Sequence, residues 1–115
     1  MDGIVGHLAK LGSLIIPIGQ TDSGDLLTLA GGRVGLGASR GITVYAPTSL
    51  DGNITVQVRS LTSATWRTLY SGGTAVGVPT GAAVTISPPV FANMRLHADT
   101  PQADNRLFDI DSQIG

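Results

Sequence analysis

The chain contains no cysteine and no glutamate, and Lys10 is its only lysine. The absence of cysteine excludes disulfide bonds, thiol nucleophiles and cysteine-ligated metals. Glu and Lys are common on exposed helices, so their scarcity favours strands and turns over helices. Charged residues make up 13% of the 115 residues, about half of the usual share for soluble proteins. A surface with so little charge suggests that part of it is buried in an assembly.

Other absences exclude several classes of partner. No run of about 18 apolar residues occurs, so no membrane span is expected. The formal net charge is −1 and the six arginines are scattered, whereas nucleic-acid binding needs clustered Lys and Arg. The N-terminal stretch lacks the basic region and the unbroken apolar core of a signal peptide, because Gly6, Lys10 and Gly12 interrupt it. We therefore expect no nucleic acid, no membrane and no signal-peptide route.

Residues that could support catalysis or bind a metal or cofactor are few. His7 and His97 are the only histidines of the chain. All acidic residues are Asp in predicted turns or at strand ends, where Asp is favoured for backbone hydrogen bonding. Three short segments could each offer two oxygen ligands to calcium, but none has the full ligand series of a calcium loop: residues 22–25, 51–53 and 109–111. We expect no enzyme activity, no metal and no cofactor.

Glycines are concentrated in Gly31–Gly37. The order Gly32-x-x-Gly35-x-Gly37 differs from the dinucleotide-binding fingerprint, and no helix with a downstream acidic residue is predicted after it. This segment is therefore interpreted as a glycine-rich loop or bulged strand.

Short alternating segments, separated by Gly, Pro, Asn and Asp, occupy most of the chain from Gly41 onward. Apolar residues recur at every second position, as in a strand with one buried face. Strands are expected over residues 26–30, 41–46, 54–59, 64–70, 76–79, 83–87, 94–98 and 106–110. This spacing of strands and turns predicts an all-β fold, an antiparallel β-sandwich or jelly roll of about seven to nine short strands.

The first 24 residues differ from the rest, and we expect an N-terminal docking arm (residues 1–24) before the β-sandwich domain (residues 25–115). Four apolar residues have the spacing of one helical face: Ile4, Leu8, Leu11 and Ile15. The pattern predicts a short helix around residues 3–11, followed by an extended piece over Ser13–Ile18. Two alternatives stay open for this apolar arm: it docks onto a neighbouring subunit, or it adds an edge strand to its own sheet.

Trp66 and Tyr70 share one face of a predicted strand. If that face is buried, Trp66 is the main anchor of the core; if it is exposed, the pair could stack on a sugar ring. Outward arginines on separate strands could form a stripe suited to subunit contacts. The candidate interface residues are apolar residues of the arm and four arginines: Ile4, Leu8, Leu11, Leu14, Ile15, Ile16, Arg33, Arg59, Arg67 and Arg95.

A sequence of features from Ile42 to Ile110 suggests a family. In chain order these are a strand ending at Ala46-Pro47, Ile54-Thr-Val-Gln-Val58, Ala64-Thr-Trp-Arg-Thr-Leu69, Gly72-Gly73, Thr80-Gly-Ala-Ala-Val84 and Met94-Arg-Leu96. This order resembles a small β-sandwich found among tailed-bacteriophage virion proteins. The resemblance implies a structural protein at the capsid surface, of the decoration or head-stabilising type, often a trimer seated on the major capsid protein lattice.

Two alternatives remain beside this interpretation. Another virion position, such as a collar, adaptor or tail component, is open. The Thr-Trp and Arg-Leu order is also similar to discoidin-like and other carbohydrate-binding sandwiches, although this chain lacks discoidin cysteines. Only five aromatic residues are present, and a sandwich core can use most of them, so the sequence favours assembly over sugar binding.

Overall fold

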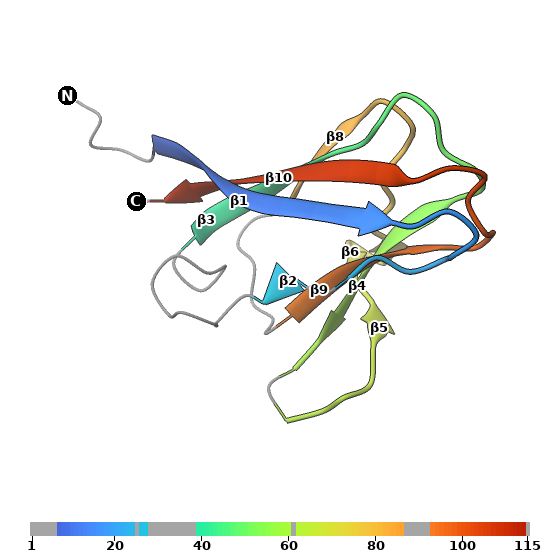
Figure 1. Cartoon of the computed structure of the whole chain (residues 1–115). Helices are drawn as coiled ribbons and strands as arrows, with labels where there is room; N and C mark the ends of the chain where they lie inside the picture. The colour runs from blue at the N-terminus through green and yellow to red at the C-terminus, as the bar shows by residue number, and fades with distance from the viewer. Residues whose placement is uncertain (1–6, 25, 28–38, 61, 87–92, 115) are drawn as a thin grey trace.

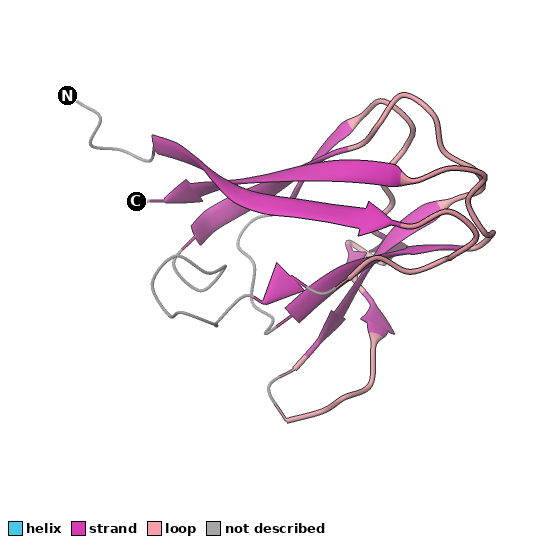
Figure 2. Cartoon of the chain, in the orientation of Figure 1, coloured by secondary structure: helices cyan, strands magenta, loops and turns pink. Residues whose placement is uncertain are grey.

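The computed structural model describes residues 7–24, 26–27, 39–60, 62–86 and 93–114, and its fold is all-β (Figure 1). Figure 2 shows strands and loops throughout these ranges. None of the described segments forms a helix, and so none forms a helix long and apolar enough to cross a membrane. The predicted fold class, an antiparallel β-sandwich, is confirmed.

Two four-stranded antiparallel sheets make up the sandwich. The first has the order β1-β10-β3-β8, with bounds His7–Ile16, Arg106–Ile114, Ser39–Tyr45 and Ala83–Ile86. The second has the order β2-β9-β4-β5, with bounds Leu26–Leu27, Asn93–Ala98, Ile54–Arg59 and Arg67–Thr68. A separate ribbon pairs β6 (Tyr70–Ser71) with β7 (Thr74–Ala75). In the first sheet, β10 lies between β1 and β3, so the first and the last of the described strands are neighbours in one sheet (Figure 1).

The core lies between the two sheets and is built from the alternating residues of the long strands. The first sheet contributes Leu14, Ile16, Ile42, Val44, Phe108 and Ile110, and the second contributes Ile54, Val56, Met94, Leu96 and Ala98. Each of these side chains is at most 4% exposed. Burying one such large apolar side chain contributes about 1.5–3 kcal/mol. The alternation of apolar residues predicted that every second residue of β3, β4, β9 and β10 faces the core, and the residues named above from these four strands do so.

The predicted arm differs from its expected structure. The helix predicted around residues 3–11 is wrong for residues 7–11, which belong to β1; residues 3–6 lie outside the described ranges. Strand β1 pairs with β10 along its length, from His7 opposite Ile114 to Ile16 opposite Arg106. The alternative of an edge strand in the chain's own sheet thus holds for this segment.

Two predicted strands in the middle of the chain also differ. The strand expected over residues 64–70 is divided into β5 and β6, and the side chain that packs on the core there is Leu69. Trp66 is absent from the core, so its prediction as the main core anchor is wrong. The strand expected over residues 76–79 is reduced to a bridge between Gly77 and Thr55, with backbone hydrogen bonds from Val56 to Val76 and from Val78 to Ile54, and β7 ends before it.

The turn between β3 and β4 contains a glycine with a positive φ, in keeping with the Gly, Pro, Asn and Asp residues that separate the strands in the sequence. Gly52 has a φ of +70°, which an L side chain rarely adopts. A Cβ atom at this position would also collide with the Asp99 carboxylate, which accepts the backbone N–H of Asn53 at 2.9 Å. The turn is thereby fixed against the start of the connection between β9 and β10.

Candidate functional site

The apolar candidates of the arm fall into three groups. Ile4 lies outside the described residues, and Leu8 and Leu11 belong to the strand β1. The candidate Arg33, which is not part of the arm, also lies outside the described residues. Leu14 and Ile16 are buried in the chain's own core and present no surface to a partner. Ile15 is 47% exposed and pairs across the strands with Leu107, which is 49% exposed. The large apolar side chains that are exposed in the described part of the arm are therefore Ile15 and Ile18, the latter 59% exposed.

The outer face of the second sheet brings two of the predicted arginines together around Trp66. The guanidinium carbon of Arg95 lies 4.6 Å from the centre of the Trp66 ring, and that of Arg59 lies 5.1 Å from it. Both distances are within the range of cation–π attraction. Trp66 is half-buried as a result, on a sheet face opposite to the core. We call Trp66, Arg59, Arg95 and Gln57 the Trp66 cluster.

Polar partners on β4 and the β1–β2 connection position Arg95. Its Nε donates to Gln57 Oε1 at 2.8 Å, and the two residues face each other across β9 and β4. Its terminal nitrogen lies 3.8 Å from a carboxylate oxygen of Asp22, whose other oxygen contacts His97 Nδ1 at 2.5 Å. Asp22 is also bridged to His97 through the backbone. Arg95 is therefore held in place before any partner binds.

The third predicted arginine of the stripe does not join this cluster. Arg67 pairs with Val58, whereas Thr68 pairs with Gln57. Paired residues leave a sheet on the same side, so Arg67 points away from the face that carries Arg95. The stripe expected from the sequence is thus reduced to two arginines with a tryptophan between the strands.

A hollow of about 500 Å³ lies beside the cluster, at the connection between β4 and β5. Its polar lining comes from two arginines and four hydroxyl residues: Arg59, Arg67, Ser60, Thr62, Ser63 and Thr65. An adjoining hollow of about 290 Å³ shares several of these residues and adds Asn93. Asn93 is 7% exposed, and its Nδ2 atom is buried without a hydrogen-bond partner in the described part of the chain.

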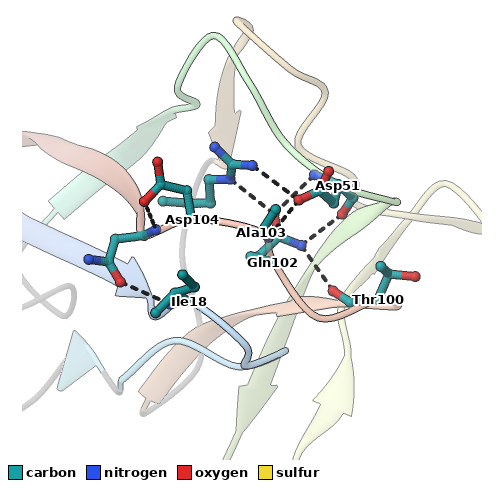
Figure 3. Close-up of polar contacts among 8 residues, drawn as sticks. Ile18, Asp51, Thr100, Gln102, Ala103 and Asp104 are labelled. Carbon is teal, nitrogen blue, oxygen red and sulfur yellow. Dashed lines mark hydrogen bonds and ion pairs between the residues drawn. The ribbon is translucent and has the colours of Figure 1, made fainter.

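At one end of the sandwich, by contrast, the buried polar side chain of Gln102 is paired within the chain, and three connections between strands meet around it (Figure 3). The Gln102 amide donates to the carbonyls of Asp51 and Thr100 at 2.8 and 3.0 Å, and its oxygen accepts the Asp51 N–H at 3.0 Å. The backbone of Gln102 bonds Gly19 and Gln20 of the β1–β2 connection. We call this set, with Arg106, the Gln102 network.

Asp51 anchors the charged part of that network (Figure 3). Its carboxylate accepts the backbone N–H of Ala103 at 2.8 Å and pairs with Arg106 at 3.0 Å. The Ala103 hydrogen bond and, after it, the Arg106 side chain lower the pKa of Asp51 from its ordinary value of 3.8. The contacts with Ala103 and Arg106 therefore favour the ionised form of the Asp51 carboxylate.

The arrangement offers little to acid–base or metal chemistry. In the described ranges no group of three or more His or Asp side chains could hold a metal ion. Asp22 and His97 form a carboxylate–imidazole pair, but the neighbouring Ser23 hydroxyl donates to Gly24 and accepts from the Leu96 N–H. That serine is 7% exposed, so its oxygen is a structural link between β9 and the β1–β2 connection.

Sequence reasoning identified Arg59, Arg95 and Trp66 but missed the residues that organise them. The sequence places Gln57 and Arg95 on the outward faces of two predicted strands, but it does not show that these strands pair. It therefore indicated their contact only weakly. No signal in the sequence pointed to Asp22, because it contacts His97, which is 75 positions away in the chain. None pointed to Asn93, because the role of that residue depends on the hollow that it lines.

Comparisons with known proteins give no assignment: no family model matches the chain, and no curated protein matches it.

Proposed function

We propose that this chain is a virion structural protein, a capsid decoration or head-stabilising protein that binds the major capsid protein lattice at the capsid surface. The role is structural, with no catalysis, cofactor, nucleic acid or membrane. The sequence features shared with phage virion sandwiches and the low surface charge support this proposal. The observation that carries it is the Trp66 cluster.

Tryptophan and arginine are the residues most enriched among interface hot spots, and such residues dominate binding when they are well packed. In the Trp66 cluster a half-buried tryptophan lies between strands with two guanidinium groups within about 5 Å of its ring. Arg95 is fixed by Gln57 and Asp22, so less side-chain freedom is lost on binding. A pre-organised aromatic and cationic surface of this kind suits a protein partner.

A sugar-binding role through Trp66 and Tyr70 is less well supported. The ring of Trp66 is already contacted by Arg59 and Arg95. Tyr70 belongs to the separate β6–β7 ribbon and is 62% exposed. The two aromatic residues therefore lack the common sheet face on which a sugar platform was expected.

Self-association into a homo-oligomer, with a trimer favoured, is part of the proposal. Ile15 and Leu107 are neighbours across β1 and β10, and each is about half exposed on the outer face of the first sheet. An apolar pair on one sheet and the Trp66 cluster on the other leave two different faces for two contacts. We assign the first to neighbouring copies and the second to the lattice.

Co-sedimentation of the purified chain with shells of the major capsid protein from the same virus tests the proposal. The intact chain is expected to bind the shells at a fixed ratio. Trp66→Ala is expected to weaken binding by about 30-fold or more, as for a hot spot of about 2 kcal/mol. Tyr70→Ala, an exposed aromatic outside the cluster, is the matched control and should bind as the intact chain does. Absence of binding by the intact chain would refute the proposal.

A further inference from the structure

The turn between β3 and β4 contains a chemically reactive pair of residues, Asp51–Gly52. In an Asp-Gly pair the backbone nitrogen of the glycine can attack the side-chain carboxyl carbon of the aspartate, because glycine has no Cβ atom to hinder the approach. A C–N bond forms, the carboxyl C–OH bond breaks, and the hydroxyl leaves with the amide proton as water. Water then reopens the resulting succinimide ring at either carbonyl and gives aspartate or isoaspartate.

The fold needs both residues of this pair. Gly52 has a φ of +70°, which an L side chain rarely adopts, and a Cβ atom there would collide with the Asp99 carboxylate. The Asp51 carboxylate accepts the Ala103 N–H and pairs with Arg106. The turn therefore keeps a reactive pair, and the surroundings of the pair decide whether it reacts.

The side chain of Asp51 is held by contacts that oppose the reaction. Its Oδ2 atom accepts the backbone N–H of Ala103 at 2.8 Å and a guanidinium N–H of Arg106 at 3.0 Å. These partners are 52 and 55 positions further along the chain, in the β9–β10 connection and at the start of β10. For the ring to form, the carboxyl carbon must approach the Gly52 nitrogen, and both contacts resist this movement.

The backbone on either side of Gly52 is held as well. The Asp51 N–H donates to Gln102 Oε1 at 3.0 Å, and the Asp51 carbonyl accepts from Gln102 Nε2 at 2.8 Å. The Asn53 N–H donates to Asp99 Oδ1 at 2.9 Å. Ring closure also needs rotation about the bond between the Cα and carbonyl carbons of Asp51, and these hydrogen bonds restrict that rotation.

Ionisation of Asp51 opposes the reaction for a separate reason. The hydroxyl that leaves belongs to the protonated carboxyl, so the neutral acid reacts faster than the carboxylate. The Ala103 hydrogen bond and, after it, the Arg106 side chain lower the pKa of Asp51 from its ordinary value of 3.8. At neutral pH the reactive form is therefore rarer in the folded chain than in the unfolded chain.

We infer that Asp51 is a latent site of isoaspartate formation, which the Gln102 network keeps unreacted in the folded chain. This inference does not rest on the proposed function, because it concerns only the chemistry of the chain itself. Isoaspartate would carry the main chain through the former side-chain methylene, so the backbone would lengthen and the carboxylate would move. The contacts with Ala103, Arg106 and Gln102 could then not re-form together.

Peptide mapping with electron-transfer fragmentation, which distinguishes isoaspartate from aspartate, measures the reaction in the full chain. Samples are kept at neutral pH, either folded or unfolded in urea, and isoaspartate at Asp51 is followed over time. Because the reaction requires the network to open, it should be at least about tenfold slower in the folded chain. Equal rates at Asp51 in the folded and unfolded chain would overturn the inference.

Two variants test the network itself. Arg106→Gln removes the charged partner of Asp51, and Gln102→Leu removes the side chain that holds the Asp51 backbone. Each should speed isoaspartate formation at Asp51 several-fold in the folded protein. The other Asp-Gly pair of the chain, Asp2–Gly3, lies outside the described residues and supplies the reference rate, which should be the same in all folded samples.

Val44→Ala is the matched control, because it lowers stability through the buried core and leaves the network in place. Its rate at Asp51 should match that of the intact chain. Equal acceleration in Val44→Ala would show that global unfolding controls the reaction, and unchanged rates in both network variants would show that the network does not. Either result would overturn the inference.

Discussion

The two polar clusters of this sandwich use similar residues in opposite ways. In the Gln102 network, Arg106 is paired with Asp51, and the Gln102 side chain bonds the backbone of Asp51 and Thr100 (Figure 3). In the Trp66 cluster, Arg59 and Arg95 lie against an aromatic ring on an open sheet face. The smaller of the two hollows near that cluster is lined by Asn93, whose buried Nδ2 donor has no partner in the part of the chain that the structure describes.

This contrast separates stability from recognition. A polar group whose bonds are satisfied internally contributes to the folded state and has nothing left for a ligand. A half-exposed arginine or tryptophan contributes little to folding but can be desolvated by a partner. We therefore expect substitutions in the Gln102 network to change stability, and substitutions in the Trp66 cluster to change binding.

The largest stability effect is expected for Gln102→Leu. The change leaves the Asp51 N–H and the Asp51 and Thr100 carbonyls without their partner, and each such group costs about 1–3 kcal/mol when buried. We expect a loss of about 3 kcal/mol in the free energy of unfolding, measured by urea denaturation. Shell binding of the folded fraction should be unchanged, and a loss of less than about 0.5 kcal/mol would contradict the structural role.

A smaller stability effect is expected for Trp66→Ala. Cation–π contacts at exposed sites contribute about 0.5–1 kcal/mol each, and two are lost, so the free energy of unfolding should fall by about 1–2 kcal/mol. The core keeps its packing, because Trp66 is outside it. Thermal unfolding of the variant checks this, and global unfolding of Trp66→Ala would show that the ring supports the core after all.

The pH dependence of stability should separate the clusters further. The pKa of Asp51 is lowered in the folded chain, so its contribution is present above the ordinary value of 3.8 and is lost as the pH falls through the folded value. Denaturation series between pH 7 and pH 2 should show stability falling in that acid range. In Asp51→Asn this part of the fall should be absent. An identical acid profile for both proteins would refute the assignment.

The smallest effect is expected for Tyr70→Ala. This ring is 62% exposed on the β6–β7 ribbon, which is separate from both four-stranded sheets, and surface substitutions of this kind usually change stability by less than about 0.5 kcal/mol. Its urea midpoint should match that of the intact chain. A marked loss of stability or of shell binding would show that Tyr70 takes part in folding contacts or in the lattice contact.

Much of the sandwich could be predicted because its long strands alternate cleanly. In β4 and β9 apolar residues occupy every second position of the sequence, and these residues are buried or partly buried in the structure. The first part of β1 could not be recognised in this way, whereas its second part coincides with the predicted extended piece that begins at Ser13. A register shift between Lys10 and Gly12 interrupts its two-residue period, so its apolar spacing looked like that of a helix.

The candidate site was only partly predictable for a related reason. Alternation shows that residues 66–70 have two faces but not which of them is inward, and the large Trp66 suggested the wrong one. The register of β5 against β4 and the packing of Leu69 on the core decide it. Asn93 carries no signal of its own, because an unpaired donor is visible only once its surroundings are known.

Binding to capsid shells by Trp66→Ala and Gln102→Leu, measured side by side, tests the division between recognition and stability most directly. We predict that Trp66→Ala stays folded and loses at least about 30-fold in shell affinity. We also predict that Gln102→Leu is clearly less stable but binds normally below its unfolding transition. Normal shell binding by Trp66→Ala, or lost binding by well-folded Gln102→Leu, would contradict it.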